Sequence, residues 1–567
     1  MLRCGCPIIG GLEPKRTDPR VYFRSGRRLF ELAVVLWASV AFVLAPRVSA
    51  QSVPAGKQPA AVPTSKKARP DAARFRARVD AVLREDRAQR AYWGILVCDR
   101  DTGDTLYDLN SDRFFTPASN AKIFTTALAL AELGPDYRFH TTLESKAVIG
   151  SDGRLAGDLV LVGRGDPDLS NRTFPYAGLP EHEGPVEKVL AEMADAAVAN
   201  GLREVDGDIV ADDSYFPYDP YPADWTVGDL FFRFGAPVSA IAFNDNTVSV
   251  EVQPASRVGE PAVILAQPAA ALDTFGHEII TGPAGTEPDP AVVRQPGTNF
   301  LLLRGAVPLG HAPMQVELAM TAPGETAALA LKQVLEARGV RVTGGIRVVH
   351  APPPETTASG EPILSHVSEE PDPKGNVLVE HVSPPLLESV RVTNKVSHNL
   401  HAELFLRTVG RERLGLGSTA AGLKVERDFL RQAGVPDGDV VLTDGSGLSR
   451  EDLVTPRAIV ALLRYAAHQP WGAGYISTLP VAGLDGTLEN RMRNMAASGL
   501  IMAKTGEVEH VRGLSGFATT LRGEHLVFAI FYNNNPEKGL GSAAPIDAIS
   551  TAMVETLGVA RPAAKRR

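Results

Sequence analysis

Residues 117–130 read PASNAKIFTTALAL and place a hydroxyl, Ser119, three residues ahead of an amine, Lys122. Apolar residues recur at spacings of three and four after Lys122, and Gly134-Pro135 supplies a stop, so the pattern predicts a helix over Ser119–Leu133. Residues three apart share one side of a helix, and a lysine kept neutral by burial or by a nearby cation can take a serine proton. The stretch therefore offers a nucleophile beside its base. The alternative is a helix cap followed by a surface lysine.

Length and charge narrow the class of protein. The chain has 567 residues and a formal net charge of −8, enough material for several domains. The first fifty residues carry a net charge of +5, so the remainder carries −13 and offers no basic face for nucleic acid. We therefore expect a globular protein that does not bind nucleic acid.

The N-terminus predicts an export signal. An apolar run from Leu29 to Ala45 follows Arg27-Arg28 and leads to Val48-Ser49-Ala50, whose small residues are typical of a signal-peptidase site. We expect a signal peptide over residues 1–50 and a mature protein in the periplasm or cell envelope, with a retained membrane anchor as the alternative. Cys98 is then the single cysteine of the mature chain, so no internal disulfide is expected.

The pattern along the chain predicts an α+β fold in which the first and last parts form one domain. A flexible linker, 51–70, is rich in Pro, Ala and Lys and precedes the fold. The predicted helices are Asp71–Arg87, Val392–Val409, Thr419–Ala433, Thr455–Ala467 and Pro545–Leu557. The predicted strands are Trp93–Cys98, Thr105–Tyr107, Leu500–Gly506, Gly513–Thr520 and His525–Tyr532. Together these strands make one five-stranded antiparallel sheet flanked by helices.

The middle of the chain has a different character. Short β-like runs separated by Gly and Pro turns follow Lys122 for more than 270 residues, and one helical stretch, Val186–Ala199, interrupts them. We interpret this part as inserted, β-rich material.

Three clusters carry the candidate chemistry: Ser119-x-x-Lys122, Ser397-His398-Asn399 in a helical region, and Lys504-Thr505-Gly506 on a strand. A Lys-Thr-Gly tripeptide is expected by chance only ~0.1 times in a chain of this length. Taken singly, each cluster also fits a helix cap, a turn or a solvated strand end. In this order, the set resembles that of the penicillin-binding proteins and serine β-lactamases.

Further stretches narrow the resemblance. They are Leu442–Arg450, Leu479–Leu488 and Phe234–Ala240, with Gly165–Asp168 and Gly207–Ser214 in the inserted part. These look like the D-alanyl-D-alanine carboxypeptidase/endopeptidase family, the class C low-molecular-mass penicillin-binding proteins, over residues 74–558. The long insert argues against a β-lactamase, whose first two motifs lie much closer together.

The resemblance implies a transpeptidase-like domain, of the serine β-lactamase type, interrupted by two nested, mostly β domains. The expected boundaries are 71–141 and 390–560 for the catalytic domain, 142–164 and 259–389 for the inserted domain, 165–258 for the domain nested in it, and 561–567 for a tail.

The resemblance also implies roles for the residues of the three clusters. Ser119 would be acylated and Lys122 would be the base in acylation. Ser397 would relay the proton to the departing amine, and Asn399 would bind the substrate amide. Lys504 would supply positive potential and help to keep Lys122 neutral.

Substrate binding is expected on the strand that carries the third cluster. Thr505 and Gly506 would face the terminal carboxylate of the substrate, and the backbone N–H groups of Ser119 and Glu507 would form the oxyanion hole. The family usually has Thr where this chain has Glu507, and a second anion should repel a free terminal carboxylate. We therefore expect weak carboxypeptidase activity and relatively better cleavage of crosslinks, unless Glu507 turns to solvent or pairs with Arg512.

A second group of residues is expected at the border of the cleft. Trp225, Asp229 and Phe234 resemble a strip that contacts the stem-peptide side chain in relatives, with Arg450 nearby. The alternative is an aromatic pair of the core and a helix cap.

Two histidines and a carboxylate leave a zinc site open as an alternative. His398, His401 and Glu403 lie on neighbouring turns, although their spacing is not His-Glu-x-x-His. The serine mechanism needs no metal, so we expect neither a metal nor another cofactor.

The resulting prediction is a serine-type D-Ala-D-Ala carboxypeptidase/endopeptidase. It would act on peptidoglycan stem peptides through an acyl-enzyme on Ser119 and would bind β-lactam antibiotics covalently. The alternative is a protein of the same fold that binds cell-wall peptides or partners with little hydrolysis.

Overall fold

The computed structural model of the chain describes residues 69–558, apart from 179, 295–299, 354, 356, 358–362, 364–374 and 538. The expected signal peptide and tail, and nearly all of the expected linker, lie outside the described residues. Among the helices that the structure does describe, none combines the length and the apolar character needed to cross a membrane.

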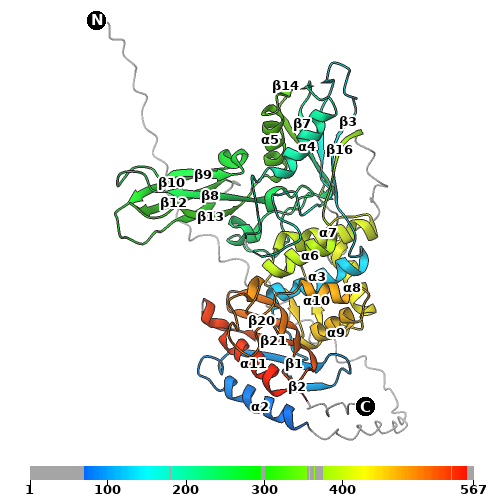
Figure 1. The fold of residues 1–567 in the computed structure, drawn as a ribbon, viewed down its shortest axis with the longest axis vertical. Helices are drawn as coiled ribbons and strands as arrows, with labels where there is room; N and C mark the ends of the chain where they lie inside the picture. Colours follow the sequence, from blue (N-terminus) through cyan, green and yellow to red (C-terminus); the bar gives the residue numbers. More distant parts are fainter. Residues whose placement is uncertain are drawn as a thin grey trace, which may run out of the picture. The chain divides into compact units, whose positions relative to one another are not determined.

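A five-stranded antiparallel sheet joins the beginning and the end of the described chain, with strand order β19-β20-β21-β1-β2 (Figure 1). Its strands are β1 (Tyr92–Asp99), β2 (Thr105–Leu109), β19 (Ile501–Val508), β20 (Val511–Thr519) and β21 (His525–Asn533). The predicted sheet and the α+β class are therefore confirmed, with every strand at its predicted place.

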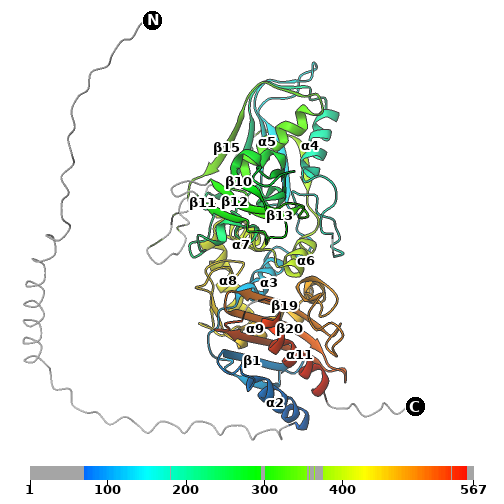
Figure 2. The same ribbon diagram turned by 90° about the vertical axis from the view of Figure 1, so that its left-hand side faces the viewer.

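Helices cover both faces of this sheet. On one face α2 (Pro70–Leu83) and α11 (Ala544–Thr556) lie side by side, against alternate residues such as Ile95 and Phe528 (Figures 1 and 2). The other face, with Leu96 and Phe531, shares its core with the remaining helices of this domain. These are α3 (Lys122–Glu132), α6 (Leu386–Val396), α7 (Asn399–Leu414), α8 (Thr419–Gln432), α9 (Pro456–Ala467) and α10 (Gly472–Thr478). Burial on both faces explains why the strands are apolar almost throughout.

The inserted part contains a second five-stranded sheet, with strand order β15-β7-β5-β3-β16. Its strands are β3 (His140–Ser145), β5 (Leu159–Val162), β7 (Ile209–Pro217), β15 (Ile346–Ala351) and β16 (Asn376–Val382). Two helices, α4 (Lys188–Ala199) and α5 (Pro323–Glu336), belong to its hydrophobic core. The pattern predicted α4 but missed α5, whose eight buried positions include only two large apolar residues, Leu331 and Leu335.

Smaller sheets complete the described residues. The strands of three-stranded sheets are β4 (Arg154–Leu155), β6 (Glu204–Val205) and β14 (Arg341–Val342); β8 (Thr247–Gln253), β9 (Val263–Gln267) and β13 (Met314–Ala319); and β10 (Phe275–Gly282), β11 (Ala291–Arg294) and β12 (Leu301–Pro308). A two-stranded ribbon pairs β17 (Val440–Val441) with β18 (Leu453–Val454).

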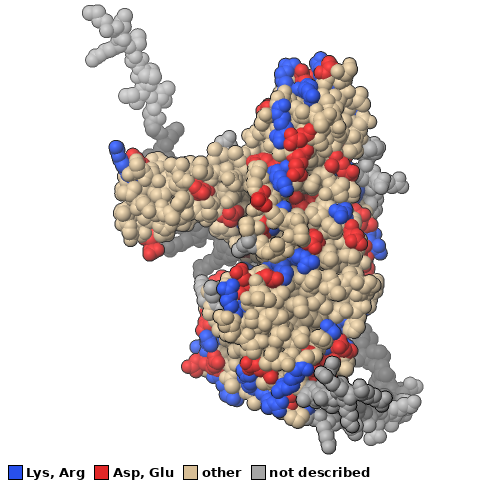
Figure 3. Space-filling view, in the orientation of Figure 1, with Lys and Arg blue, Asp and Glu red and all other residues tan. Residues whose placement is uncertain are grey.

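Lysines and arginines are interspersed with acidic residues on the face drawn in Figure 3.

The structure joins the inserted segments more closely than the expected domains suggest. Strand β7, from residues 165–258, pairs with β5 and β15, which come from the segments on either side. The domain boundaries stay a prediction. A boundary at residue 165 or 258 would separate β7 from the two strands with which it pairs.

Two predicted helices differ from the structure at the candidate site. The helix expected from Ser119 begins as a 3₁₀ turn, η1 (Ala118–Ala121), before α3 starts at Lys122. The helical stretch expected over Val392–Val409 is broken at Ser397, which has φ 63° and separates α6 from α7. The helical spacing of apolar residues continues through η1 and through Ser397, so the sequence pattern did not predict either interruption.

Candidate active site

The 3₁₀ turn η1 places Ser119 directly before the first residue of α3. Lys122 Nζ lies 3.0 Å from Ser119 Oγ, within hydrogen-bond distance. The turn fits against the loop around Gly447, which has φ 79°, and a Cβ at that position would lie 2.0 Å from the Ala118 carbonyl oxygen. A glycine is therefore required where this loop passes the nucleophile turn.

Lys122 is fully buried and makes polar contacts with three elements. Besides Ser119, its Nζ donates to Asn399 Oδ1 at 2.6 Å and to the Ser446 carbonyl oxygen at 2.6 Å. Burial lowers the pKa of Lys122 to about 8, although nearby carboxylates, of which Asp444 contributes most, oppose this shift. An amine with this pKa is partly neutral near pH 7 and can accept a proton.

The second lysine contacts the second serine. Lys504 Nζ donates to Ser397 Oγ at 2.9 Å and to the Thr505 carbonyl oxygen at 2.9 Å. Burial, and then the charge of Lys122, holds the pKa of Lys504 well below its usual value. Lys504 was expected to help keep Lys122 neutral, and the structure gives burial as the main cause of the lowered pKa of both amines.

Asn399 connects the nucleophile turn to the inserted part. Its Oδ1 accepts from Lys122, while its Nδ2 donates to the Phe234 carbonyl oxygen at 2.8 Å. Asn399 is the first residue of α7, so the break at Ser397 points the Asn399 side chain toward Lys122. The three clusters predicted from the sequence thus meet at one place.

Strand β19 forms one wall of this place. A Cβ at Gly506 would lie 2.4 Å from both Asn120 Nδ2 and the Pro117 carbonyl oxygen, so glycine permits the close approach of β19 to η1. Thr505 Oγ1 donates to Thr487 Oγ1 at 2.8 Å. Glu507, with 67% of its side chain exposed, pairs with Arg512 Nη2 at 2.9 Å. The pairing with Arg512 was the alternative left open for Glu507.

A cavity of about 460 Å³ opens in front of the two serines. It is lined by Ser119, Ser397, Gly486, Thr487, Asn490, Arg491, Thr505, Gly506, Glu507, Arg512, Gly539, Ser542 and Ala543. Two predicted substrate-binding residues are not in this lining. Arg450 is an exposed residue, and Asp229 accepts hydrogen bonds from Thr226 N and Oγ1 within its own turn.

Two residues of the predicted aromatic strip, Trp225 and Phe234, form hydrogen bonds with residues around the site. Trp225 Nε1 donates to Asp444 Oδ2 at 2.8 Å, and Asp444 also accepts from the backbone of the loop that carries Ser446. Phe234 contributes its carbonyl oxygen to Asn399, while its ring is 47% exposed. Trp225 therefore contacts the loop of Asp444 and Ser446, Phe234 contacts the first residue of α7, and Asp229 fits the alternative of a cap.

A family model describes the same architecture. The model of the D-Ala-D-Ala carboxypeptidase 3 (S13) family matches residues 75–553. The D-alanyl-D-alanine carboxypeptidase of Actinomadura sp. (strain R39) is 34% identical over 499 residues, which is 86% of this chain and 86% of that protein. The chain belongs to the S13 family. This membership confirms the resemblance stated from the motifs.

Other members and solved structures agree with the S13 assignment. The carboxypeptidase DacB of Haemophilus influenzae is 26% identical over 78% of this chain and 85% of its own length. The crystal structure of penicillin binding protein 4 from H. influenzae has a TM-score of 0.70 with 24% identity, and the match covers 84% of this chain and 98% of that one. This structural likeness shows that the fold is shared.

Three residues that make contacts at this site had no role predicted from the sequence, although they lie in the stretches that carry the family resemblance. The Ser446 carbonyl and Asp444 belong to the stretch 442–450, and Thr487 to the stretch 479–488. The motifs that contain these residues could have indicated a site. Residue types alone could not show that the backbone carbonyl of Ser446 accepts from Lys122.

The two histidines of the zinc alternative face a carboxylate other than Glu403. Glu403 accepts from Gly445 N at 3.0 Å, and burial raises its pKa to about 8. The carboxylate that faces His398 and His401 is instead Asp245, from the inserted part. The proposed trio with Glu403 is therefore wrong in its third member.

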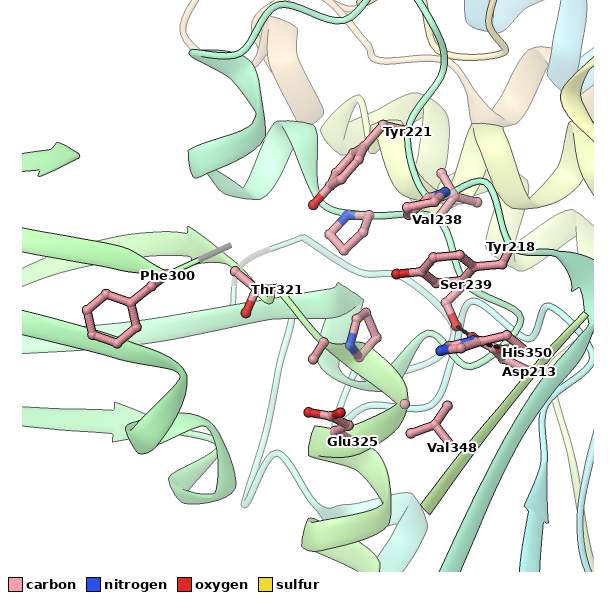
Figure 4. A pocket seen from close by; sticks show the side chains of 15 residues that line it. Asp213, Tyr218, Tyr221, Val238, Ser239, Phe300, Thr321, Glu325, Val348 and His350 are labelled. Carbon is pink, nitrogen blue, oxygen red and sulfur yellow. Dashed lines mark hydrogen bonds and ion pairs between the residues drawn. The ribbon is translucent and has the colours of Figure 1, made fainter. Parts of the chain in front are cut away.

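A second cavity, of about 490 Å³, lies at the start of α5 near the ends of β7 and β15 (Figure 4). Its wall includes Asp213, which accepts from Ser239 Oγ at 3.0 Å and lies 2.7 Å from His350 Nδ1. The Tyr218 ring packs against His350 with centroids 4.2 Å apart. No predicted site residue lines this cavity.

Proposed function

We propose that this S13 protein is a serine-type D-Ala-D-Ala carboxypeptidase/endopeptidase that acts through an acyl-enzyme on Ser119. The observation that carries the proposal is the 3.0 Å contact between Ser119 Oγ and the buried Lys122 amine, at the edge of a cavity shared with Ser397. Family membership supports the same reaction class.

In the first half of the reaction, neutral Lys122 takes the proton of Ser119 as its Oγ attacks the carbonyl carbon of the D-Ala–D-Ala bond. The backbone N–H groups of Ser119 and Glu507 bind the oxyanion. The C–N bond then breaks, and Ser397, which contacts Lys504, relays the proton taken up by Lys122 to the departing amine, so that Lys122 is neutral again. Free D-Ala, or the crosslinked amine, leaves.

In the second half, water attacks the ester carbon. Lys122 takes a proton from the water and gives it to Ser119 Oγ as the ester bond breaks. The acyl group leaves Ser119 as a shortened stem peptide with a new carboxylate. Asn399 positions the acyl amide, and Thr505 positions the terminal carboxylate before cleavage. Both residues lie at the junction of the three clusters.

β-Lactam binding follows from the same chemistry. Penicillin binding protein 4 of H. influenzae has been solved in complex with a β-lactam. In this chain, attack by Ser119 Oγ on the lactam carbonyl would open the ring. The nitrogen released from the lactam carbonyl stays covalently attached to the acyl group and cannot diffuse away. A stable ester adduct on Ser119 is therefore expected.

Intact-mass measurement after exposure to a penicillin tests the proposal. Wild type should gain the mass of one β-lactam, and Ser119→Ala should gain none. An adduct on the Ser119→Ala variant places the nucleophile elsewhere and contradicts the proposal. Turnover of a D-Ala-D-Ala peptide separates the peptidase from the alternative, a protein that binds cell-wall peptides with little hydrolysis.

An action on peptidoglycan places the enzyme outside the cytoplasm. The export signal proposed over residues 1–50 gives the route. N-terminal sequencing of the protein recovered from the cell envelope tests this part, and a start at Gln51 is the expected result.

A further inference from the structure

His398 stands between two predicted catalytic residues, Ser397 and Asn399, yet it does not line the cavity. Its ring is buried and lies 4.0 Å, centroid to centroid, from the ring of His401, one turn further along α7. His398 Nε2 is 3.2 Å from Asp245 Oδ2, and His401 Nε2 is 3.1 Å from Asp245 Oδ1. One carboxylate from the inserted part therefore faces both imidazoles.

Asp245 is an ionised partner for these rings. Burial opposes its ionisation, but Arg172 donates from Nη2 to Asp245 Oδ2 at 2.6 Å and holds the pKa of Asp245 well below its usual value. Both side chains are almost inaccessible to solvent. The carboxylate is thus a fixed acceptor rather than a group that exchanges protons near neutral pH.

The backbone determines which nitrogen of His398 carries the proton. His398 is the N-cap of α7, and its Nδ1 accepts the His401 backbone N–H at 3.5 Å. Burial lowers the pKa of His398 to about 3, so the ring is neutral and has one N–H. The contact of Nδ1 with the backbone favours the tautomer whose N–H is on Nε2, the atom 3.2 Å from Asp245 Oδ2. His401 Nε2 is within hydrogen-bond geometry of Asp245 Oδ1, whereas the contact of His398 Nε2 is a close approach without that geometry.

The turn that presents Asp245 is itself strongly constrained. Asn244, Asp245 and Asn246 have φ of 50°, 55° and 50° in succession, just before β8 begins. Asn and Asp adopt the left-handed region more readily than other residues with a Cβ, but usually as single residues rather than three in succession. Asn246 Nδ2 donates to the Pro237 carbonyl oxygen at 2.9 Å, and Asn244 Nδ2 to the Thr247 carbonyl oxygen at 2.8 Å. Asp245 therefore has little freedom to follow a moving partner.

Ser397 needs a fixed neighbour because it too is left-handed, with φ 63°. Relaxing this residue toward the helical region would rejoin α6 to α7 and turn the Ser397 hydroxyl away from Lys504. The side chain of the next residue, His398, attaches the turn to Asp245, and Asn399 attaches it to Lys122.

We propose that Asp245 is a positioning residue for the reaction. Through its hydrogen bond with His401 and its close contact with the His398 ring, and with Arg172 on its other side, it fixes the turn Ser397–Asn399 so that the Ser397 hydroxyl stays between Lys504 and the departing amine. The inserted part would then control proton delivery in the catalytic domain. This inference rests on the proposed function of Ser397.

Asp245→Asn is the test, with Asp439→Asn as the matched control. The two aspartates are equally buried at 5%, and each is paired with one arginine, but Asp439 accepts from Thr455, the N-cap residue of α9, and contacts none of the three clusters. The rate of covalent labelling of the full chain by a fluorescent penicillin is measured beside the melting temperature. We expect Asp245→Asn to slow labelling by about 10- to 100-fold, since small displacements of reacting groups have such effects.

The control separates positioning from stability. Asp439→Asn should lower the melting temperature but label at the wild-type rate. Labelling of Asp245→Asn at the wild-type rate overturns the proposal, whereas the absence of any adduct on wild type overturns the proposed function instead.

A second variant tests the link through His398. In His398→Asn the side chain still caps α7 but is too short to reach Asp245, so it should label as slowly as Asp245→Asn. The double variant should be no slower than either single variant, because both remove one interaction. Independent, multiplicative losses contradict the proposal, and so does one equivalent of zinc found in the wild-type protein by elemental analysis.

Discussion

At the scale of single residues, the protonation of Lys122 sets the condition for activity. In the proposed mechanism the neutral amine is the reactive form, and burial lowers the pKa of this lysine to about 8. Lowering the pH protonates the amine and removes the base, so the rate of acylation should rise with pH through the neutral range and level off above about 8. Penicillin labelling followed over pH measures this dependence. A rate that falls with rising pH below pH 8 would contradict the assignment of the base.

Lys122→Arg examines the same base without removing the positive side chain. A guanidinium remains protonated in proteins, so it cannot accept the Ser119 proton. We expect acylation to fall by about 100- to 10,000-fold, the range typical of a lost general base. The variant should still fold, which circular dichroism checks. Near-normal labelling by this variant would exclude Lys122 as the base.

Glu507 has a weaker effect in the structure than its charge alone suggests. Arg512 pairs with its carboxylate at 2.9 Å, and most of the side chain is exposed, so the repulsion of a substrate carboxylate is partly compensated. In Glu507→Thr, Arg512 would remain in the cavity wall without its partner. We expect the KM for a free pentapeptide to fall by up to about 10-fold, with kcat unchanged, since exposed charges interact weakly. Kinetics on pentapeptide and on a crosslinked dimer measure it, and an unchanged ratio of the two activities would make the side chain irrelevant.

At the scale of elements, the contact of β19 with η1 sets the width of the site. Because a Cβ at Gly506 would lie 2.4 Å from Pro117 O, Gly506→Ala should push the strand away from the nucleophile turn. Overpacking of this kind costs about 1–3 kcal/mol of unfolding free energy. A shift of the strand should slow acylation by at least about 10-fold.

Gly157→Ala is the control for this prediction. Its added Cβ would meet only Ala147 Cβ at 3.8 Å, and Gly157 belongs to the inserted part. Denaturant titration and penicillin labelling compare the two variants. Equal labelling rates would show that β19 and η1 can separate without loss of function.

At the scale of the whole molecule, the inserted part is a structural component of the active site. Trp225 donates to Asp444, whose loop supplies the Ser446 carbonyl to Lys122. Trp225→Phe leaves a buried carboxylate oxygen without this donor and should lower the unfolding free energy by about 1–3 kcal/mol. Acylation should slow as well, because the Lys122 acceptor shifts.

Trp93→Phe separates these two effects. Trp93 is similarly buried and donates to the Ala88 carbonyl oxygen at 2.9 Å, but it belongs to the core on the α2 side of the central sheet. This variant should lose stability and keep its labelling rate. If Trp225→Phe also keeps its rate, the contact is structural only.

The sequence alone determined the central sheet and the three clusters. Each strand of the sheet is a short apolar run between turn residues, and that signal is local. The clusters have fixed residue types at short spacing, and the helical spacing of Ser119 and Lys122 already placed the two groups within reach. Family membership then confirmed the reaction class that these motifs predicted.

Only the tertiary structure decided what surrounds these groups. The helical pattern runs through Ser397, where the structure breaks it and brings Ser397 to Lys504 and His398 to Asp245, residues far away in the chain. The partner of Glu507 was open until the strands paired and brought Arg512 opposite it. Helix α5 was missed because only two of its buried residues, Leu331 and Leu335, are large apolar ones. The break at Ser397 and the partner of Glu507 have one physical reason in common: hydrogen bonds and ion pairs between distant segments leave no periodic trace in the sequence.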